Sequence, residues 1–122
     1  MYEIKIIRSF SGAHRLKGYR GKCENVHGHN WRVEVELISG RLDKTGISVD
    51  FRIAKKVLDR VLKKLDHALL NDVAGFRDKN PSAENIARHI FDSIRNKFSK
   101  KAKVKRVTVW ETENAGASYT ED

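Results

Sequence analysis

The sequence predicts an α+β fold, an antiparallel four-stranded sheet with two helices packed on one face. Segments in which apolar and polar residues alternate lie near both ends of the chain. Two segments with apolar residues at every third or fourth position lie between them. Strands and helices that occur in separate runs are typical of helices segregated to one face of an antiparallel sheet. The 122 residues contain no internal repeat, and we expect one domain, 1–122.

Two long strands are expected first. The segment 2–10 has apolar residues at even spacing, and WRVEVELIS, 31–39, alternates apolar with charged residues, as in a half-buried antiparallel strand. SGRLDKTG follows and contains turn residues. Near the end of the chain, KVKRVTVWET predicts another strand with Val107, Val109 and Glu111 on one side, and a short final strand is expected around Tyr119.

Two amphipathic helices are expected between these strands. The first runs from Phe51 to Leu65, with Asp66 and His67 at its end. The second begins after NPSAEN, where Asn80 or Ser82 can act as the N-cap and Pro81 suits the first turn.

Composition narrows the possible functions. A single cysteine excludes an internal disulfide framework, and no apolar run reaches the roughly 20 residues of a membrane span. We therefore expect a soluble cytoplasmic protein without a membrane partner. The formal net charge of +9 favours an anionic partner, which leaves both nucleic acid and a small phosphorylated substrate open.

Three histidines are candidate metal ligands. His27 and His29 stand two positions apart at the start of a strand, so their side chains point to the same side. If the first two strands form a hairpin, His14 at the end of the first strand comes close to both. Three imidazoles with one open position are typical of catalytic zinc, although imidazole also suits iron and nickel. Nearby Cys23 is either a fourth ligand or a base with a lowered pKa.

Other polar residues suit acid–base chemistry or binding. Asp66 and His67 place a carboxylate beside an imidazole at a helix end, which suits a proton relay but also a solvent-exposed cap. Glu111 lies on a strand side that is otherwise apolar, so it is either at the sheet margin or held for a ligand. We assign His89, on the flank of the second helix, no function.

Together these motifs closely resemble the 6-pyruvoyl-tetrahydropterin synthase / 6-carboxy-tetrahydropterin synthase family. The resemblance rests on FSGAH, C-x-x-x-HGHN, VDF, LDHALLN, PSAEN and WET, in this order from about Phe10 to Tyr119. It implies the tunnelling fold (T-fold), in which trimers join their sheets into a barrel and two trimers stack into a homohexamer.

The resemblance also implies roles for individual residues. His14, His27 and His29 would bind zinc. Cys23 would be the proton-abstracting base, and Asp66 with His67 the relay that completes the catalytic triad across a subunit boundary. Glu111 would anchor the pterin, and Ser82 would contact it or simply cap the helix. The implied substrate is 7,8-dihydroneopterin triphosphate, whose triphosphate would account for the basic charge.

The spacing of Cys23 from HGH resembles that of the 6-carboxy-tetrahydropterin synthases of the queuosine (7-deazaguanine) pathway. These enzymes release acetaldehyde and triphosphate, whereas the pyruvoyl enzymes of mammals have a longer insert. Glu24, however, also satisfies the E-x-x-HGH motif of a branch that forms 6-hydroxymethyl-dihydropterin for folate. Either group could therefore act as the base, or Glu24 could be a solvated loop residue.

Two hypotheses remain in which the protein is not an enzyme. A basic nucleic-acid-binding module would call for aromatic residues interleaved with lysine or arginine on an exposed face, whereas most aromatics here fall on apolar stripes, so we expect no nucleic acid partner. A metal-stabilised structural protein would need a fourth protein ligand to close the metal site.

Overall fold

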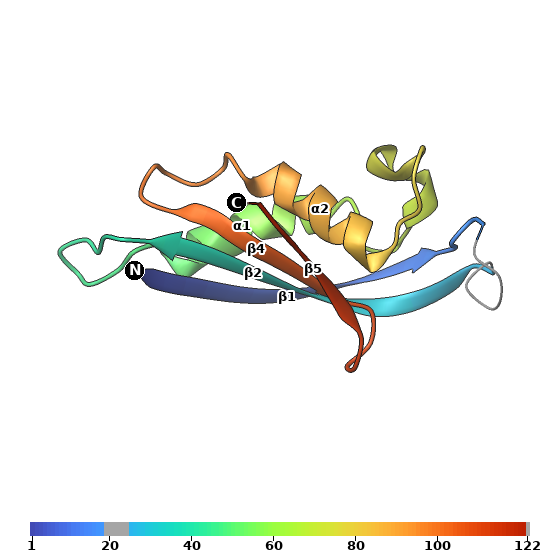
Figure 1. Ribbon diagram of the computed structural model, residues 1–122, viewed down its shortest axis with the longest axis horizontal. Helices are drawn as coiled ribbons and strands as arrows, with labels where there is room; N and C mark the ends of the chain where they lie inside the picture. Colours follow the sequence, from blue (N-terminus) through green and yellow to red (C-terminus); the bar gives the residue numbers. More distant parts are fainter. Residues whose placement is uncertain (19–24, 122) are drawn as a thin grey trace.

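The computed structural model describes residues 1–18 and 25–121. Within these ranges a five-stranded sheet, in the strand order β3-β1-β2-β4-β5, carries two helices on one face (Figure 1). The α+β prediction is thus confirmed. The elements are β1 Tyr2–His14, β2 His27–Ser39, α1 Phe51–Leu62, β3 Ala68–Leu69, the 3₁₀ turns η2 Leu70–Asp72 and η3 Ala74–Phe76, α2 Ala83–Ile94, β4 Lys103–Trp110 and β5 Gly116–Thr120.

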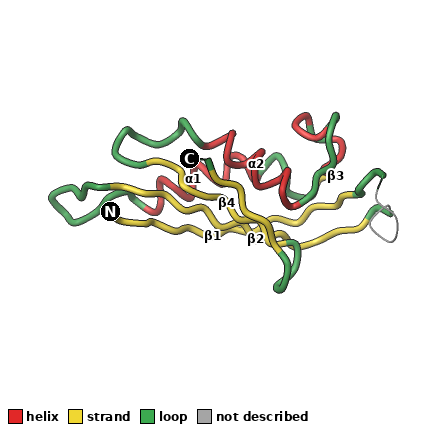
Figure 2. The backbone as a smooth tube through the Cα atoms, in the orientation of Figure 1, coloured by secondary structure: helices red, strands yellow, loops and turns green. Residues whose placement is uncertain are grey.

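The first two strands form a long antiparallel hairpin that extends well beyond the helices (Figure 2). Both are longer than predicted, because they continue through GAH and HGHN, which lack the clear alternation of apolar residues. Phe10 lies opposite Trp31, Gly12 opposite His29, and His14 opposite His27. The register therefore brings the predicted metal ligands to one end of the sheet.

The helices cover the apolar face of the sheet. Helix α1 packs against β1, and α2 packs against β4 and β5. Asp50 caps α1, which ends at Leu62 and not at Leu65 as predicted. Ser82 caps α2 by accepting a hydrogen bond from the backbone N–H of Asn85. Pro81 therefore precedes the cap and does not belong to the first helical turn.

The sheet has one strand more than predicted. Ala68 and Leu69 pair in parallel with Gly12 and Ala13 to form β3 at the edge of the sheet. Two residues carry no detectable periodicity, so the sequence gives no signal for such a strand. The pairing of β3 with β1 matters for the candidate site, because it holds the preceding Asp66 and His67 beside the end of β1.

Among the described residues, no helix is long and apolar enough to cross a membrane.

Candidate metal centre and adjoining residues

Four side chains from three strands converge at the end of the sheet. His14 ends β1, His27 and His29 begin β2, and Glu111 directly follows β4. Val33 pairs with Val109, so continuation of this register places Glu111 level with Trp31 on the side that faces the helices. The potential ligand atoms of these four residues all lie within 4.8 Å of one another. We call His14, His27 and His29 the histidine cluster.

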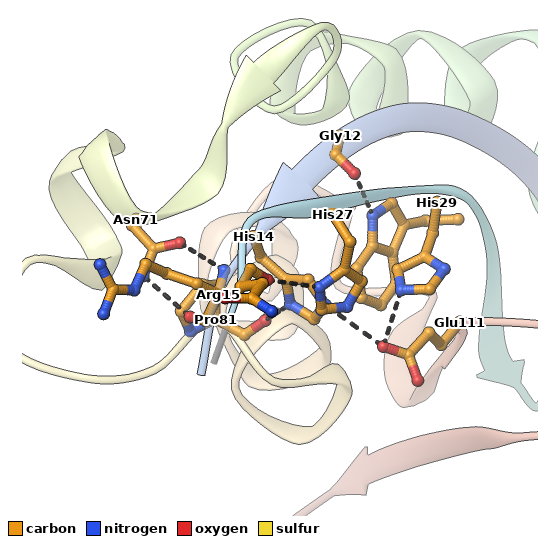
Figure 3. A network of polar contacts seen from close by, with 10 residues as sticks. Gly12, His14, Arg15, His27, His29, Asn71, Pro81 and Glu111 are labelled. Carbon is orange, nitrogen blue, oxygen red and sulfur yellow. Dashed lines mark hydrogen bonds and ion pairs between the residues drawn. The ribbon is translucent and has the colours of Figure 1, made fainter. Parts of the chain in front are cut away.

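The cluster is closely spaced (Figure 3). The Nε2 atoms of His14 and His27 are 3.0 Å apart. Glu111 Oε1 lies 3.3 Å from His14 Nε2 and 3.1 Å from His29 Nε2. A tetrahedral zinc ion with bonds of about 2.1 Å separates its ligands by about 3.4 Å. The observed spacings are therefore close to those that a tetrahedral ion requires.

Backbone carbonyls orient two of the imidazoles. His14 Nδ1 lies 2.7 Å from the Pro81 carbonyl oxygen, and His27 Nδ1 lies 2.7 Å from that of Asn25. A carbonyl only accepts, so each Nδ1 must carry a proton, and Nε2 is then the ring nitrogen that can offer a lone pair to a metal at the centre. Partners of this kind are typical of metal-binding histidines. The donor set therefore fits a divalent metal such as zinc.

Trp31 forms the floor beneath the cluster. Its fully buried indole meets the rings of His14 and His29 edge-on, with centroids 5.0 and 5.1 Å away. Its Nε1–H donates to the Gly12 carbonyl at 3.1 Å, which ties the floor to β1. A Cβ at Gly12 would lie 3.1 Å from the Phe10 ring, so a side chain there would disturb this packing. From the sequence, Trp31 was only the first apolar residue of the alternating segment 31–39.

The electrostatics of the site favour the neutral form of His29. Burial is the largest cause of a lowered pKa at His29. The Glu111 carboxylate acts in the opposite direction, and the His14 and His27 imidazoles add smaller lowering contributions. His29 Nε2 is buried, and the Glu111 carboxylate lies 3.1 Å from it without the geometry of a hydrogen bond. A neutral imidazole nitrogen is what metal coordination requires.

Asp66 and His67 form a pair at the sheet edge. His67 Nδ1 lies 3.0 Å from Asp66 Oδ2, and the backbone N–H of Ser11 donates to Asp66 Oδ1 at 2.9 Å. The Ser11 hydrogen bond, with a further contribution from His67, lowers the pKa of Asp66. His67 has a left-handed backbone with φ of 57°, a costly conformation for a non-glycine residue that is often found at functional sites.

Among the described residues, no hydrogen bond or ion pair links this pair to the histidine cluster. His67 lines a hollow of about 480 Å³ together with Ser11, Ala13, Asn30 and one member of the histidine cluster, His29. Ser11, Ala13 and Asn30 alternate along β1 and β2 with His14 and His29, so their side chains belong to the opposite face of the sheet. His67 and one predicted metal ligand, His29, thus line the same hollow of one chain.

Two asparagines hold the segment that follows His14. The side-chain amide of Asn71 accepts from the Arg15 N–H at 2.9 Å and donates to the Arg15 carbonyl at 3.0 Å (Figure 3). Asn80 makes the same pair of bonds with Lys17. Sequence reasoning gave Asn71 no role and named Asn80 only as a possible N-cap, although they lie within the motifs LDHALLN and NPSAEN. Each amide thus satisfies the backbone N–H and the carbonyl of one residue beyond the end of β1.

The remaining predicted site residues are not placed in the cluster. Ser82 is used as the α2 cap, which was the alternative to pterin contact. Cys23 and Glu24 lie outside the described residues, so their roles stay predictions.

Comparison with known proteins agrees with this geometry. Residues 3–122 match the family model described as 6-pyruvoyl tetrahydropterin synthase. The chain belongs to this family. The structure of the 6-pyruvoyl tetrahydropterin synthase of Caenorhabditis elegans is similar, with a TM-score of 0.86 and 30% identity over 99% of this chain and 96% of that one. The T-fold is thus confirmed for the single chain.

Relatives within the family carry different names. A protein of Archaeoglobus fulgidus, 41% identical over 93% of this chain and 91% of its own length, bears the provisional name 6-carboxy-5,6,7,8-tetrahydropterin synthase. A protein of Pyrococcus furiosus, 39% identical over 88% of both chains, is named dihydroneopterin monophosphate aldolase. The family membership therefore supports an enzyme that acts on a pterin, while the reaction differs between similar relatives.

Proposed function

We propose that this protein is a zinc-dependent lyase that converts 7,8-dihydroneopterin triphosphate and water into 6-carboxy-5,6,7,8-tetrahydropterin, acetaldehyde and triphosphate. The product would enter queuosine (7-deazaguanine) synthesis. The observation that carries the proposal is the convergence of three Nε2 atoms at the sheet end in a chain of the tetrahydropterin synthase family. The spacing of Cys23 from HGH favours the carboxy product, as does the name of the Archaeoglobus relative.

In this proposal the three histidines hold the ion, and Glu111 binds the substrate. Zinc would supply Lewis acidity toward the hydroxyl groups of the substrate side chain. Glu111 reaches the cluster from a partly exposed position, and a carboxylate there can accept two N–H bonds from the aminopyrimidine edge of a pterin. In the alternative, Glu111 is a fourth ligand that closes a structural site. Removal of its carboxylate would then also remove the metal.

Proton transfer is assigned to Cys23, Asp66 and His67. The thiolate of Cys23 would remove a proton from a side-chain carbon, and the pair would supply the relay. Since no hydrogen bond or ion pair links the pair to the cluster in the described part of the chain, we infer that the complete site is shared between two subunits. This is consistent with the homohexamer that we propose as the working assembly.

A second reaction is favoured by two observations. The E-x-x-HGH motif places Glu24 beside Cys23, and the Pyrococcus relative is named as an aldolase of a dihydroneopterin phosphate. With Glu24 as base, the same site would cleave the bond between the first two side-chain carbons and release 6-hydroxymethyl-dihydropterin and a two-carbon phosphorylated aldehyde. A 6-pyruvoyl product, after the name of the nematode relative, is a third outcome on the same substrate.

Two matched variants test the base. Cys23→Ala should abolish formation of the carboxy product but retain zinc, whereas Glu24→Gln should retain most activity. Turnover of the zinc-loaded proteins is measured by chromatography of the pterins, and metal content by mass spectrometry. Loss of zinc in Cys23→Ala would show that the thiol is a ligand and would overturn its assignment as base. Loss of turnover in Glu24→Gln alone would move the role to the glutamate.

A further inference from the structure

A second hollow lies on the helical layer, away from the histidine cluster. It is a groove of about 710 Å³ between α1, η3 and α2. Val57 and Val61 of α1 line it together with Val73, which provides an apolar floor. We call it the α1–α2 groove. None of its lining residues belongs to the histidine cluster, to Glu111 or to the Asp66–His67 pair.

Positively charged side chains without ion-pair partners among the described residues line the groove. Arg60, Lys64 and Lys97 line it, and no aspartate or glutamate does. Within the part of the chain that the structure describes, none of these three cations forms an ion pair. Arg88 and Arg95 of the α2 region, by contrast, both pair with Asp92. The three cations thus line one hollow that has no carboxylate among its lining residues.

His89 adds a polar group to the same wall. Its ring lies so close to the Gly75 backbone that a Cβ at Gly75 would come within 2.5 Å of Nδ1. The ring packs against Phe76, with centroids 4.9 Å apart. In residues 1–18 and 25–121, its ring nitrogens have no hydrogen-bond partner. The imidazole is therefore fixed at the groove with its hydrogen-bonding capacity free.

We propose that the α1–α2 groove binds an organic phosphate of nucleotide size. The apolar body would lie on the valine floor, and the phosphates would be held by Arg60, Lys64 and Lys97, with His89 as a further hydrogen-bonding group. Two features support this class of ligand. The volume lies within the range of about 300–1,000 Å³ that is typical of small-molecule sites. Three cations that line one groove, with no carboxylate in its lining, provide the charge complementarity that phosphate requires. This site is separate from the proposed active site and does not depend on its reaction.

The test uses ATP as probe, with adenosine and inorganic tripolyphosphate as its two halves. Binding to the zinc-loaded protein is followed by NMR of valine methyl groups and of the histidine Cε1–H groups. ATP should shift Val57, Val61, Val73 and His89 in a saturable way. Each half should bind at least about tenfold more weakly, because it uses only the apolar floor or only the cations.

Charge reversal identifies the groups that bind. The double variant Lys64→Glu/Lys97→Glu should bind ATP at least about tenfold more weakly, because it removes two phosphate partners. The control Lys44→Glu/Lys100→Glu changes the net charge equally at exposed sites outside the groove and should bind as the native protein does. Circular dichroism confirms that both variants fold. The proposal is overturned if ATP shifts only the histidine cluster, if no saturable shift occurs, or if both double variants lose affinity alike.

Discussion

Glu111 Oε1 lies 3.1 Å from His29 Nε2, so a carboxylate at the end of β4 reaches the centre of the histidine cluster. This contact has two interpretations, an anchor for the substrate or a fourth metal ligand. They differ in what removal of the charge does, because an anchor affects substrate binding and a ligand affects metal binding.

We expect Glu111→Gln to retain zinc and to raise KM at least about tenfold, since hydrogen bonds to a charged group contribute about 1.5–3 kcal/mol each. Zinc content is measured by mass spectrometry and KM by steady-state turnover. Glu113→Gln, in the same loop, should leave both unchanged. His27→Ala provides the reference for a lost ligand, and its zinc affinity should fall by more than about 100-fold. If Glu111→Gln loses zinc as His27→Ala does, Glu111 is a ligand.

Trp31 should contribute to stability through both its packing and its indole N–H. Trp31→Phe leaves the buried Gly12 carbonyl without its donor and a gap under the histidine rings, at a cost of about 2–4 kcal/mol in the free energy of unfolding. Trp110→Phe is the matched control, because the buried Nε1 of Trp110 has no hydrogen-bond partner among the described residues. Urea denaturation should show a much smaller change there. Equal losses in the two variants would contradict the role given to the Trp31 hydrogen bond.

His89 should make stability depend on pH. Burial, with a further contribution from Lys79, lowers its pKa, so the unfolded chain binds the proton at a higher pH than the folded chain. Stability from this residue is therefore complete above the unfolded pKa of about 6.5 and is lost as the pH falls toward the folded value. His89→Gln should show a shallower decline in unfolding free energy between pH 7 and pH 5, by at most one proton. An unchanged slope would contradict the lowered pKa.

Complementation between inactive variants tests whether the active site is shared. His27→Ala removes a metal ligand and His67→Ala removes the relay, so each homo-oligomer should be inactive. If the relay of one subunit serves the metal of another, mixed oligomers contain some sites with both residues intact, and random mixing should restore about a quarter of the native activity. The measurement is turnover after joint refolding of the two variants. No recovery in verified mixed oligomers would place the whole site within one subunit.

The sequence predicted the α+β fold and the convergence of the three histidines, because strand alternation and helical periodicity are local signals. It could not predict how near Glu111 comes to the histidines, since this depends on the pairing of β2 with β4. Nor could it predict β3, the carbonyl partners of His14 and His27, or the amide pairs of Asn71 and Asn80. These contacts join residues through backbone groups, which every residue type carries and which therefore leave no mark in the sequence.

The most direct test of the central claim is to identify the pterin formed when the zinc-loaded protein is incubated with 7,8-dihydroneopterin triphosphate. We predict 6-carboxy-5,6,7,8-tetrahydropterin together with acetaldehyde, detected by mass spectrometry, and no product from the His27→Ala variant. Formation of 6-hydroxymethyl-dihydropterin would contradict the carboxy assignment and favour Glu24 as base. Absence of any turnover by the zinc-loaded native protein would contradict the proposed enzyme.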